Sequence, residues 1–204
     1  MRFSDQAVRV KLDALDESQA EGCTHASLHS AYSSTGANEL SGGSPAYARK
    51  ALTWAAASGR SKATSASVAF DVPAGSTVAW IGLWDAVTAG DFKAMVPNGG
   101  GIPEAFTVPD ISNDTLEAPG HGFSNTNQVV VWAVPGVALP AGLSEGTIYY
   151  VISATTDDLQ LSATSGGAAI NITAVGSGFL MRIIAEVYVG QGTHTVSSIT
   201  MTED

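Results

Sequence analysis

Two histidines near the start of this 204-residue chain are the first candidates for metal chemistry. His25 and His29 are four residues apart, a spacing that places two ligands together on a helix. The surrounding sequence, CTHASLHS, has the texture of a strand instead. On a strand, residues four apart lie about 13 Å from each other, too far to share one ion. We therefore expect neither a metal site nor a cofactor, and we expect Cys23 to be a small buried apolar residue.

Carboxylates in the second half of the chain could bind calcium or cleave sugars. The candidates are Asp157 and Asp158, together with Asp110, Asp114 and Glu117. Their spacing does not match an EF-hand loop, and adjacent acids in turns are usually solvated. The chain also lacks the G-x-S-x-G pattern that would expose a nucleophilic serine. We expect a protein that is not an enzyme, and a glycan hydrolase is the less favoured alternative.

Aromatic residues could instead bind a ligand by stacking. Trp54, Trp80 and Trp84 are expected in the core. Trp132, Tyr149 and Tyr150 lie in a shorter module, which must expose more of its aromatic surface. These three are candidate surface or ligand contacts, and a carbohydrate-binding module remains an alternative function.

The stretch from Ser67 to Asp85 is the element around which the chain is organised. Residues 68–72 alternate with the two-residue period of a strand, and 73–77 have turn chemistry. Residues 78–84 are apolar on both faces, which is typical of a central strand covered on both sides. The two segments predict a hairpin at the centre of a β-domain.

Residues 4–20 are the one segment that predicts a helix. Val8, Leu12 and Leu15 share one face, and Ser4 is a candidate N-cap. The helix could pack on the sheet of its own domain or against a neighbouring subunit, and both interpretations stay open.

Short strands separated by turns account for the rest of the chain. They are expected at 23–31, 47–54, 92–96, 115–118, 128–134, 148–154, 158–162, 170–174, 179–189 and 194–201. The pattern of strands and turns changes near Thr107, and the composition of the last two strands is closer to that of the first half of the chain than to that of the middle. We therefore predict an outer domain of 1–107 with 179–204, and an inserted β-module over 108–178.

The charge pattern excludes several partners. The formal net charge is −10, and seven of the nine Lys and Arg residues lie in the first 62 positions. Such an acidic chain is a poor ligand for nucleic acid or an anionic membrane. No signal peptide or membrane span is expected, because no apolar run is long enough.

Four short motifs of the outer domain resemble the short tail-fibre-like or minor tail proteins of tailed bacteriophages. They are ASLHSA at 26–31, the segment 35–50 (TGANELSGGSPAYARK), 70–86 and 192–202. Within 108–178, the segments 121–124, 139–152 and 159–170 resemble a β-module of phage tail and fibre proteins. The segment QVVVW at 128–132 departs from that module, where most copies are more polar.

The strand pattern and the resemblance together predict an all-β fold. We expect a jelly-roll-like β-sandwich with an N-terminal helix and an inserted small β-barrel or sandwich. The resemblance implies a virion structural protein, made in the host cytoplasm, that acts on the tail, as a capsid decoration or in host adhesion. Its partners would be other virion proteins and a host-surface glycan.

Self-association is expected for the outer domain. Both faces of 78–84 and of 179–189 are apolar, so one sandwich needs more cover than a single helix provides. We predict a trimer in which the inserted module faces away from the particle, and a monomer covered by its own loops is the alternative. The basic residues of 1–62 suit a docking face, so Val8, Leu12, Leu15, Arg49 and Lys50 are candidate assembly contacts.

Overall fold

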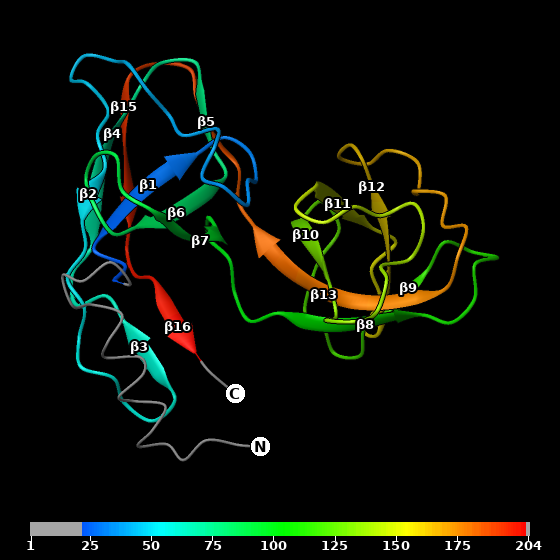
Figure 1. The fold of residues 1–204 in the computed structure, drawn as a ribbon. Helices are drawn as coiled ribbons and strands as arrows, with labels where there is room; N and C mark the ends of the chain where they lie inside the picture. Colours follow the sequence, from blue (N-terminus) through cyan, green and yellow to red (C-terminus); the bar gives the residue numbers. More distant parts are fainter. Residues whose placement is uncertain (1–21, 203–204) are drawn as a thin grey trace. The chain divides into compact units, whose positions relative to one another are not determined.

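The chain is all β in the part that the structure describes, residues 22–202 (Figure 1). In this computed structural model, those residues form sixteen strands and no helix. The helix predicted over 4–20, with Val8, Leu12 and Leu15, lies outside the described residues. The strands divide between two compact units: unit 1 comprises the described parts of Met1–Val96 and Glu186–Asp204, and unit 2 is Pro97–Ala185.

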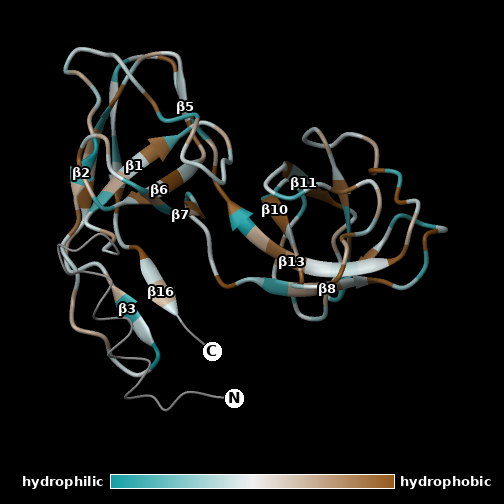
Figure 2. Cartoon of the chain, viewed as in Figure 1, coloured by the Kyte–Doolittle hydropathy of each residue, from teal (hydrophilic) through white to brown (hydrophobic). Residues whose placement is uncertain are grey.

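Unit 1 is built on a four-stranded sheet with the order β2-β1-β6-β7. Its strands are β1 (His25–His29), β2 (Lys50–Ala51), β6 (Trp80–Trp84) and β7 (Phe92–Pro97). Leu28 lies opposite Ile81, and both side chains point into an apolar core. All five residues of β6 are buried, which confirms the predicted central strand covered on both faces. Figure 2 shows hydrophobic stretches within β1 and β6.

The C-terminal segment completes unit 1 by pairing with residues 61–78. The pairs are β4 (Val68–Val72) with β15 (Gly192–Val196), β5 (Ser76–Val78) with β14 (Glu186–Tyr188), and β3 (Ser61–Ala63) with β16 (Thr200–Thr202). All three ladders are antiparallel. The first two share one register, because residues 73–75 and 189–191 interrupt both chains at the same point.

The predicted hairpin over 67–85 is wrong. The turn does form, and Ser76 N donates to Pro73 O at 3.3 Å. However, β4 pairs with β15, β5 pairs with β14, and β6 pairs with β1. The turn bends a chain that keeps pairing with the returning C-terminal segment, so the neighbours of this stretch come from far away in the sequence.

Unit 2 is a closed barrel of six antiparallel strands. Its strands are β8 (Glu104–Val108), β9 (Leu116–Glu117), β10 (Gln128–Ala133), β11 (Ile148–Ile152), β12 (Asp158–Ser162) and β13 (Gly176–Ile183). Their order around the barrel is β10-β11-β12-β9-β8-β13, closed by the pairing of β13 with β10. Alternate residues such as Val129, Val131, Val151 and Leu161 point inward and form the core.

The segments by which the chain enters and leaves unit 2 are bonded to each other at one end of the barrel. We call this end, with Asn98, Gln128, Ile184 and Ala185, the neck. Asn98 O accepts from Ile184 N at 2.7 Å, and Asn98 Nδ2 donates to Ile184 O at 2.9 Å. Gln128 Oε1 accepts from Ala185 N at 2.8 Å. The barrel therefore closes on itself where the chain enters and leaves.

Several predicted strand bounds change in the structure. The single strand expected over 179–189 is two strands, β13 in the barrel and β14 in unit 1, and the strand expected over 194–201 is also two, β15 and β16. Of the strand expected over 47–54 only β2 forms, and none forms over 170–174. The expected domain boundaries at 108 and 178 fall within β8 and β13, which lie wholly in the barrel because they pair with each other. The jelly roll stays a prediction.

The described residues contain no helix of the length and apolar character that a membrane crossing requires.

Replacing Gly178 with Ala should destabilise the barrel. A Cβ there would lie 2.6 Å from Trp132 O and 2.7 Å from a ring carbon of Phe106. Overpacking of this kind costs about 1–3 kcal/mol. Gly190→Ala is the matched control, because its Cβ would meet nothing within 4 Å. Urea unfolding should show a loss for Gly178→Ala and no loss for the control, and equal stability of both variants would contradict the close approach.

Candidate functional site

A buried chain of hydrogen bonds crosses one face of the unit 1 sheet. The Nδ1–H of His29 donates to Ala37 O at 2.8 Å, since a carbonyl can only accept. The neutral ring then accepts at Nε2 from Ser27 Oγ, 2.6 Å away. Ser27 Oγ in turn accepts from Trp84 Nε1 at 2.7 Å. Each of these groups has a partner, which a buried polar network requires.

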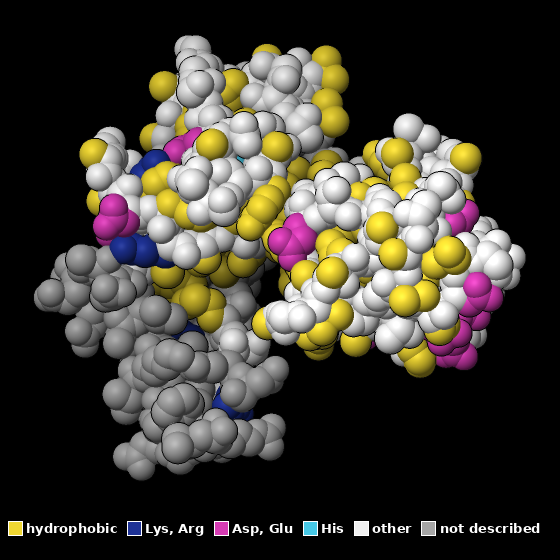
Figure 3. All heavy atoms as spheres, turned by 45° about the vertical axis from the view of Figure 1, so that its right-hand side comes forward, with side chains coloured by type: hydrophobic (Ala, Val, Ile, Leu, Met, Phe, Trp, Pro, Cys, Tyr) yellow, Lys and Arg dark blue, Asp and Glu magenta, His cyan; other side chains and the backbone are white. Residues whose placement is uncertain are grey.

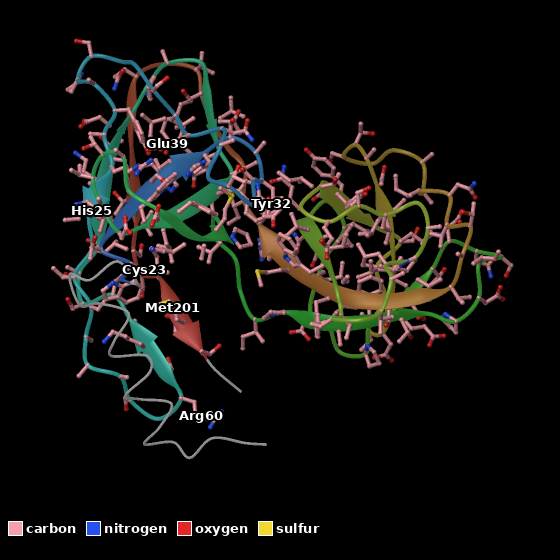
Figure 4. All side chains as sticks on the ribbon, in the orientation of Figure 1. Cys23, His25, Tyr32, Glu39, Arg60 and Met201 are labelled. Carbon is pink, nitrogen blue, oxygen red and sulfur yellow. The ribbon has the colours of Figure 1, made fainter. Side chains whose placement is uncertain are left out.

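An ion pair continues this network toward the surface. Arg49 Nε lies 3.0 Å from Glu39 Oε1, and Arg49 Nη2 lies 2.8 Å from Glu39 Oε2, a bidentate arrangement. Tyr47 OH donates to Glu39 and accepts from Leu28 N at 2.7 Å. Burial raises the pKa of Tyr47, and the Glu39 carboxylate adds to that effect. Figure 4 labels Glu39 over the sheet and His25 at the beginning of β1.

Aromatic packing joins the two halves of the network. The Arg49 guanidinium carbon lies 3.4 Å from the centroid of the Trp84 ring, a cation–π contact. The ring of His29 stacks with that of Trp84 at 6.5 Å between centroids, and Phe92 meets Trp84 edge-on at 5.2 Å. Gly36 has a φ of 78°, and a Cβ there would overlap the Trp84 and Phe92 rings. The site accepts only glycine at this position.

We call Ser27, His29, Glu39, Tyr47, Arg49 and Trp84 the motif network. Its members come from β1, from β6 and from the loop over 30–49 that separates β1 from β2. The loop therefore has a fixed path over the sheet. Its exposed segment, 41–46, is held by Gln191, which accepts from Ser44 N at 3.2 Å and donates to Pro45 O at 3.3 Å.

The motif network cannot perform nucleophilic catalysis in this arrangement. Ser27 and His29 have the atoms of a hydroxyl–imidazole pair, but both side chains are 0% exposed. The Ser27 oxygen already accepts from Trp84, and the second histidine nitrogen faces a carbonyl and not a carboxylate. The arrangement positions a surface loop, and this is the role that the geometry supports.

His25 and His29 do not form a pair. His25 Nδ1 lies 2.9 Å from Thr24 Oγ1, and burial lowers its pKa, with a further contribution from Arg49. Burial also lowers the pKa of His29. Within residues 22–202, no three His, Cys, Asp or Glu side chains come together as metal ligands would. Cys23 is buried in the core of unit 1.

Three of the candidate carboxylates accept hydrogen bonds from backbone amides, one within its own turn and two from other segments of unit 2. Asp110 accepts from Ser112, and these hydrogen bonds lower its pKa. Asp114 Oδ1 accepts from Ile172 N at 2.7 Å, and Asp157 Oδ1 accepts from Gly120 N at 3.1 Å. Asp110, Asp114 and Asp157 each accept from a different backbone neighbour. Asp158 and Glu117 lie directly opposite each other on β12 and β9, and they are the two candidate carboxylates that the strand pairing brings together.

The three candidate aromatic contacts occupy two environments in the barrel. Tyr149 is 4% exposed in the core, and its OH accepts from Ser144 N. Trp132 and Tyr150 lie on the outer face and are half-buried, and Tyr150 OH accepts from Gln128 Nε2 at 3.1 Å. Alternation along β10 and β11 separates these environments.

The candidate assembly contacts also differ in environment. Arg49 belongs to the motif network, and its side chain is 12% exposed. Lys50 lies on β2 at the edge of the sheet, half-exposed and 3.7 Å from Asp71. Val8, Leu12 and Leu15 lie outside the described residues.

Glu39, Tyr47 and Gln191 were missed as functional residues. Glu39 and Arg49 are opposite charges separated by a segment with no other charge, and this pattern alone could have suggested an ion pair. No local signal marks Gln191, because its partners lie more than a hundred residues away.

In residues 22–202 these features define an all-β chain of two units, with a loop fixed over the sheet of unit 1 and a barrel inserted between the two parts of unit 1. Residues 22–98 match the family model described as podophage GP4 fiber I protein gp80. The match contains the whole motif network and ends at the neck, where unit 2 begins. It supports a bacteriophage fibre-like protein, but not specifically the short tail-fibre or minor tail family. No curated protein and no solved structure matches the chain.

Lowering the pH should destabilise unit 1 through His29. Its folded pKa lies below the ordinary value of 6.5, so the unfolded chain binds more protons once the pH falls below 6.5. Stability should be full above that pH and fall progressively below it. Urea unfolding at several pH values should show a shallower fall for His29→Gln than for the wild type. His25→Gln is the control, and it should keep the His29 contribution; an unchanged slope in His29→Gln would contradict the assignment.

Proposed function

We propose that the chain is a non-enzymatic structural protein of a phage particle in which unit 1 docks on the virion and unit 2 contacts the host surface. The observation that supports docking is the motif network, since it lies entirely inside the matched residues and fixes an exposed loop. A contact that must be repeated on every particle is helped by such a pre-formed surface.

Charge supports the division of roles between the units. In the full sequence, unit 1 has eight Lys and Arg against twelve Asp and Glu, whereas unit 2 has one cation, Arg182, against seven carboxylates. An acidic virion surface would attract the cations of unit 1 and repel the barrel. Tail and capsid are both placements that this arrangement suits, and gold-labelled antibody on intact particles would distinguish them.

A glycan-binding role is the second candidate. Trp132 and Tyr150 are half-buried on the outer face of the barrel, which is the observation in its favour. Glycan-array binding of the purified full chain, lost in Tyr150→Ala, would support it. A hydrolase is less favoured. It would be supported if the purified protein shortened host polysaccharide and the Asp157→Asn or Asp158→Asn variant did not.

Reversing the charge of Lys50 should weaken incorporation into particles. Lys50 is a half-exposed cation at the edge of the docking unit. A loss of 1.4 kcal/mol in binding would lower occupancy about tenfold below saturation. Quantitative mass spectrometry of purified particles, with each variant supplied in trans, measures this effect. Arg182→Glu in the barrel is the matched control and should incorporate normally. Equal losses, or none, would argue against docking through this edge.

The predicted trimer should be visible in solution. The trimer was predicted in part from the apolar segment 179–189. This segment divides between the two units, and its residue Leu180 lies in the core of the barrel. In unit 1, Val187 and Val189 of the returning segment are 71% and 89% exposed, surface that a subunit contact would bury. Light scattering should give three times the chain mass of 20.8 kDa, and Val189→Glu should lower it. A wild-type monomer at micromolar concentrations would remove the trimer.

A further inference from the structure

Three loops meet at the end of the barrel opposite the neck, and we call them the distal loops: 109–115, 134–147 and 163–175. The strand pairings place them together. Gly176, at the beginning of β13, lies opposite Val108 at the end of β8, and Gly178 lies opposite Ala133 at the end of β10. The neck contacts of Ile184 lie at the other end of β13. The distal loops are thus the part of unit 2 farthest along the strands from the chain crossings.

Hydrogen bonds join the distal loops to one another. Thr173 N donates to Ala141 O at 3.0 Å, which links the second loop to the third. Ile172 N donates to Asp114 Oδ1 at 2.7 Å, which links the third to the first. Gly176 packs against Ala138 and Pro140 so closely that a Cβ would lie 2.8 Å from Pro140 N. The loops therefore form one ordered surface, which lowers the entropic cost of binding a partner.

This surface exposes large apolar side chains from each of its three loops. Ile111 is 42% exposed, Val137 is 44% exposed and Val175 is 61% exposed. Among the described residues only seven large apolar side chains are at least 42% exposed, and three of them lie on these loops. Single exposed apolar residues are ordinary, but a group on loops bonded to one another indicates a contact surface.

The charges around this surface have one sign. The distal loops contain Asp110, Asp114 and Glu145 but no Lys or Arg. The single cation of unit 2, Arg182, is six residues along β13 from Gly176, which is about 20 Å on a strand. Figure 3 shows carboxylates at several places around the visible face of the barrel, apolar side chains scattered across that face and no Lys or Arg on it. A surface with exposed apolar side chains and carboxylates but no cation complements a partner that offers apolar surface together with Lys or Arg.

We propose that the distal loops bind a protein exposed on the host cell surface, through an apolar patch on that protein that is flanked by Lys or Arg. This proposal rests on the proposed function, in which unit 2 makes the host contact. Anionic lipid, lipopolysaccharide phosphate and acidic polysaccharide are disfavoured as ligands, because the carboxylates would repel them and the distal loops hold no cation.

The test measures binding of the labelled full-length chain to intact cells of the strain that propagates the phage. Val137→Ser with Val175→Ser should lower the affinity at least about tenfold, equivalent to 1.4 kcal/mol. Val87→Ser is the matched control, because Val87 is 48% exposed on a unit 1 turn, and it should bind like the wild type. Val175→Thr, nearly isosteric, provides a second variant if the double variant does not fold, and it should show a smaller loss.

Treatment of the cells identifies the class of partner. Proteinase K should abolish wild-type binding, and periodate oxidation of surface sugars should leave it intact. Binding that survives the protease and is lost with periodate would overturn the proposal in favour of a glycan, and binding to phosphatidylglycerol vesicles would overturn it in favour of lipid. Normal incorporation into particles combined with undiminished binding of the valine variants would overturn this inference alone, whereas absence of the chain from particles would overturn the proposed function.

Discussion

The antiparallel pairing of 186–202 with 61–78 is the constraint on which unit 1 depends. Each of the three ladders joins residues more than a hundred positions apart, and the bend at 73–75 is matched by one at 189–191. Both strands of the β4–β15 pair contribute side chains to the core of unit 1, namely Phe70, Val72 and Val196. Such contacts close a very long loop, so this pairing requires that the two ends of the barrel lie close together.

The barrel satisfies that requirement through its own closure. The strands on which the chain enters and leaves, β8 and β13, are neighbours, and Asn98 bonds to Ile184 through both backbone and side chain. An insertion whose ends lie side by side replaces a short turn without separating the strands around it. This geometry explains how a matched family segment that ends at residue 98 can be followed by 87 residues of barrel before unit 1 resumes at Glu186.

The sequence was sufficient for local structure and insufficient for pairing. Alternation predicted β4 and β12 at their observed bounds, and two-sided apolarity predicted that β6 is central, since these patterns report burial of each residue. The hairpin over 67–85 was wrong because a turn fixes chain direction and not the partner strand. The break at Ile184–Ala185 was missed because apolar residues continue through it, and its cause is the neck bond to Asn98. At the candidate site, Trp84 was correctly expected in the core, but the roles of Glu39 and Gln191 depend on contacts that no local pattern records.

Burial decides what the polar residues of unit 1 can do. A serine, a histidine and a carboxylate are present within thirteen positions. However, Ser27 and His29 have no exposed surface, and Glu39 forms an ion pair with Arg49. Each hydrogen bond in this set has one donor and one acceptor in a fixed direction, so the network specifies one conformation of the loop. Apolar contacts alone would be compatible with several loop conformations. The cost of burying these groups is offset because every one of the bonds described is made. A loop specified to this degree is a pre-formed surface, and a partner that bound it would not have to order it first.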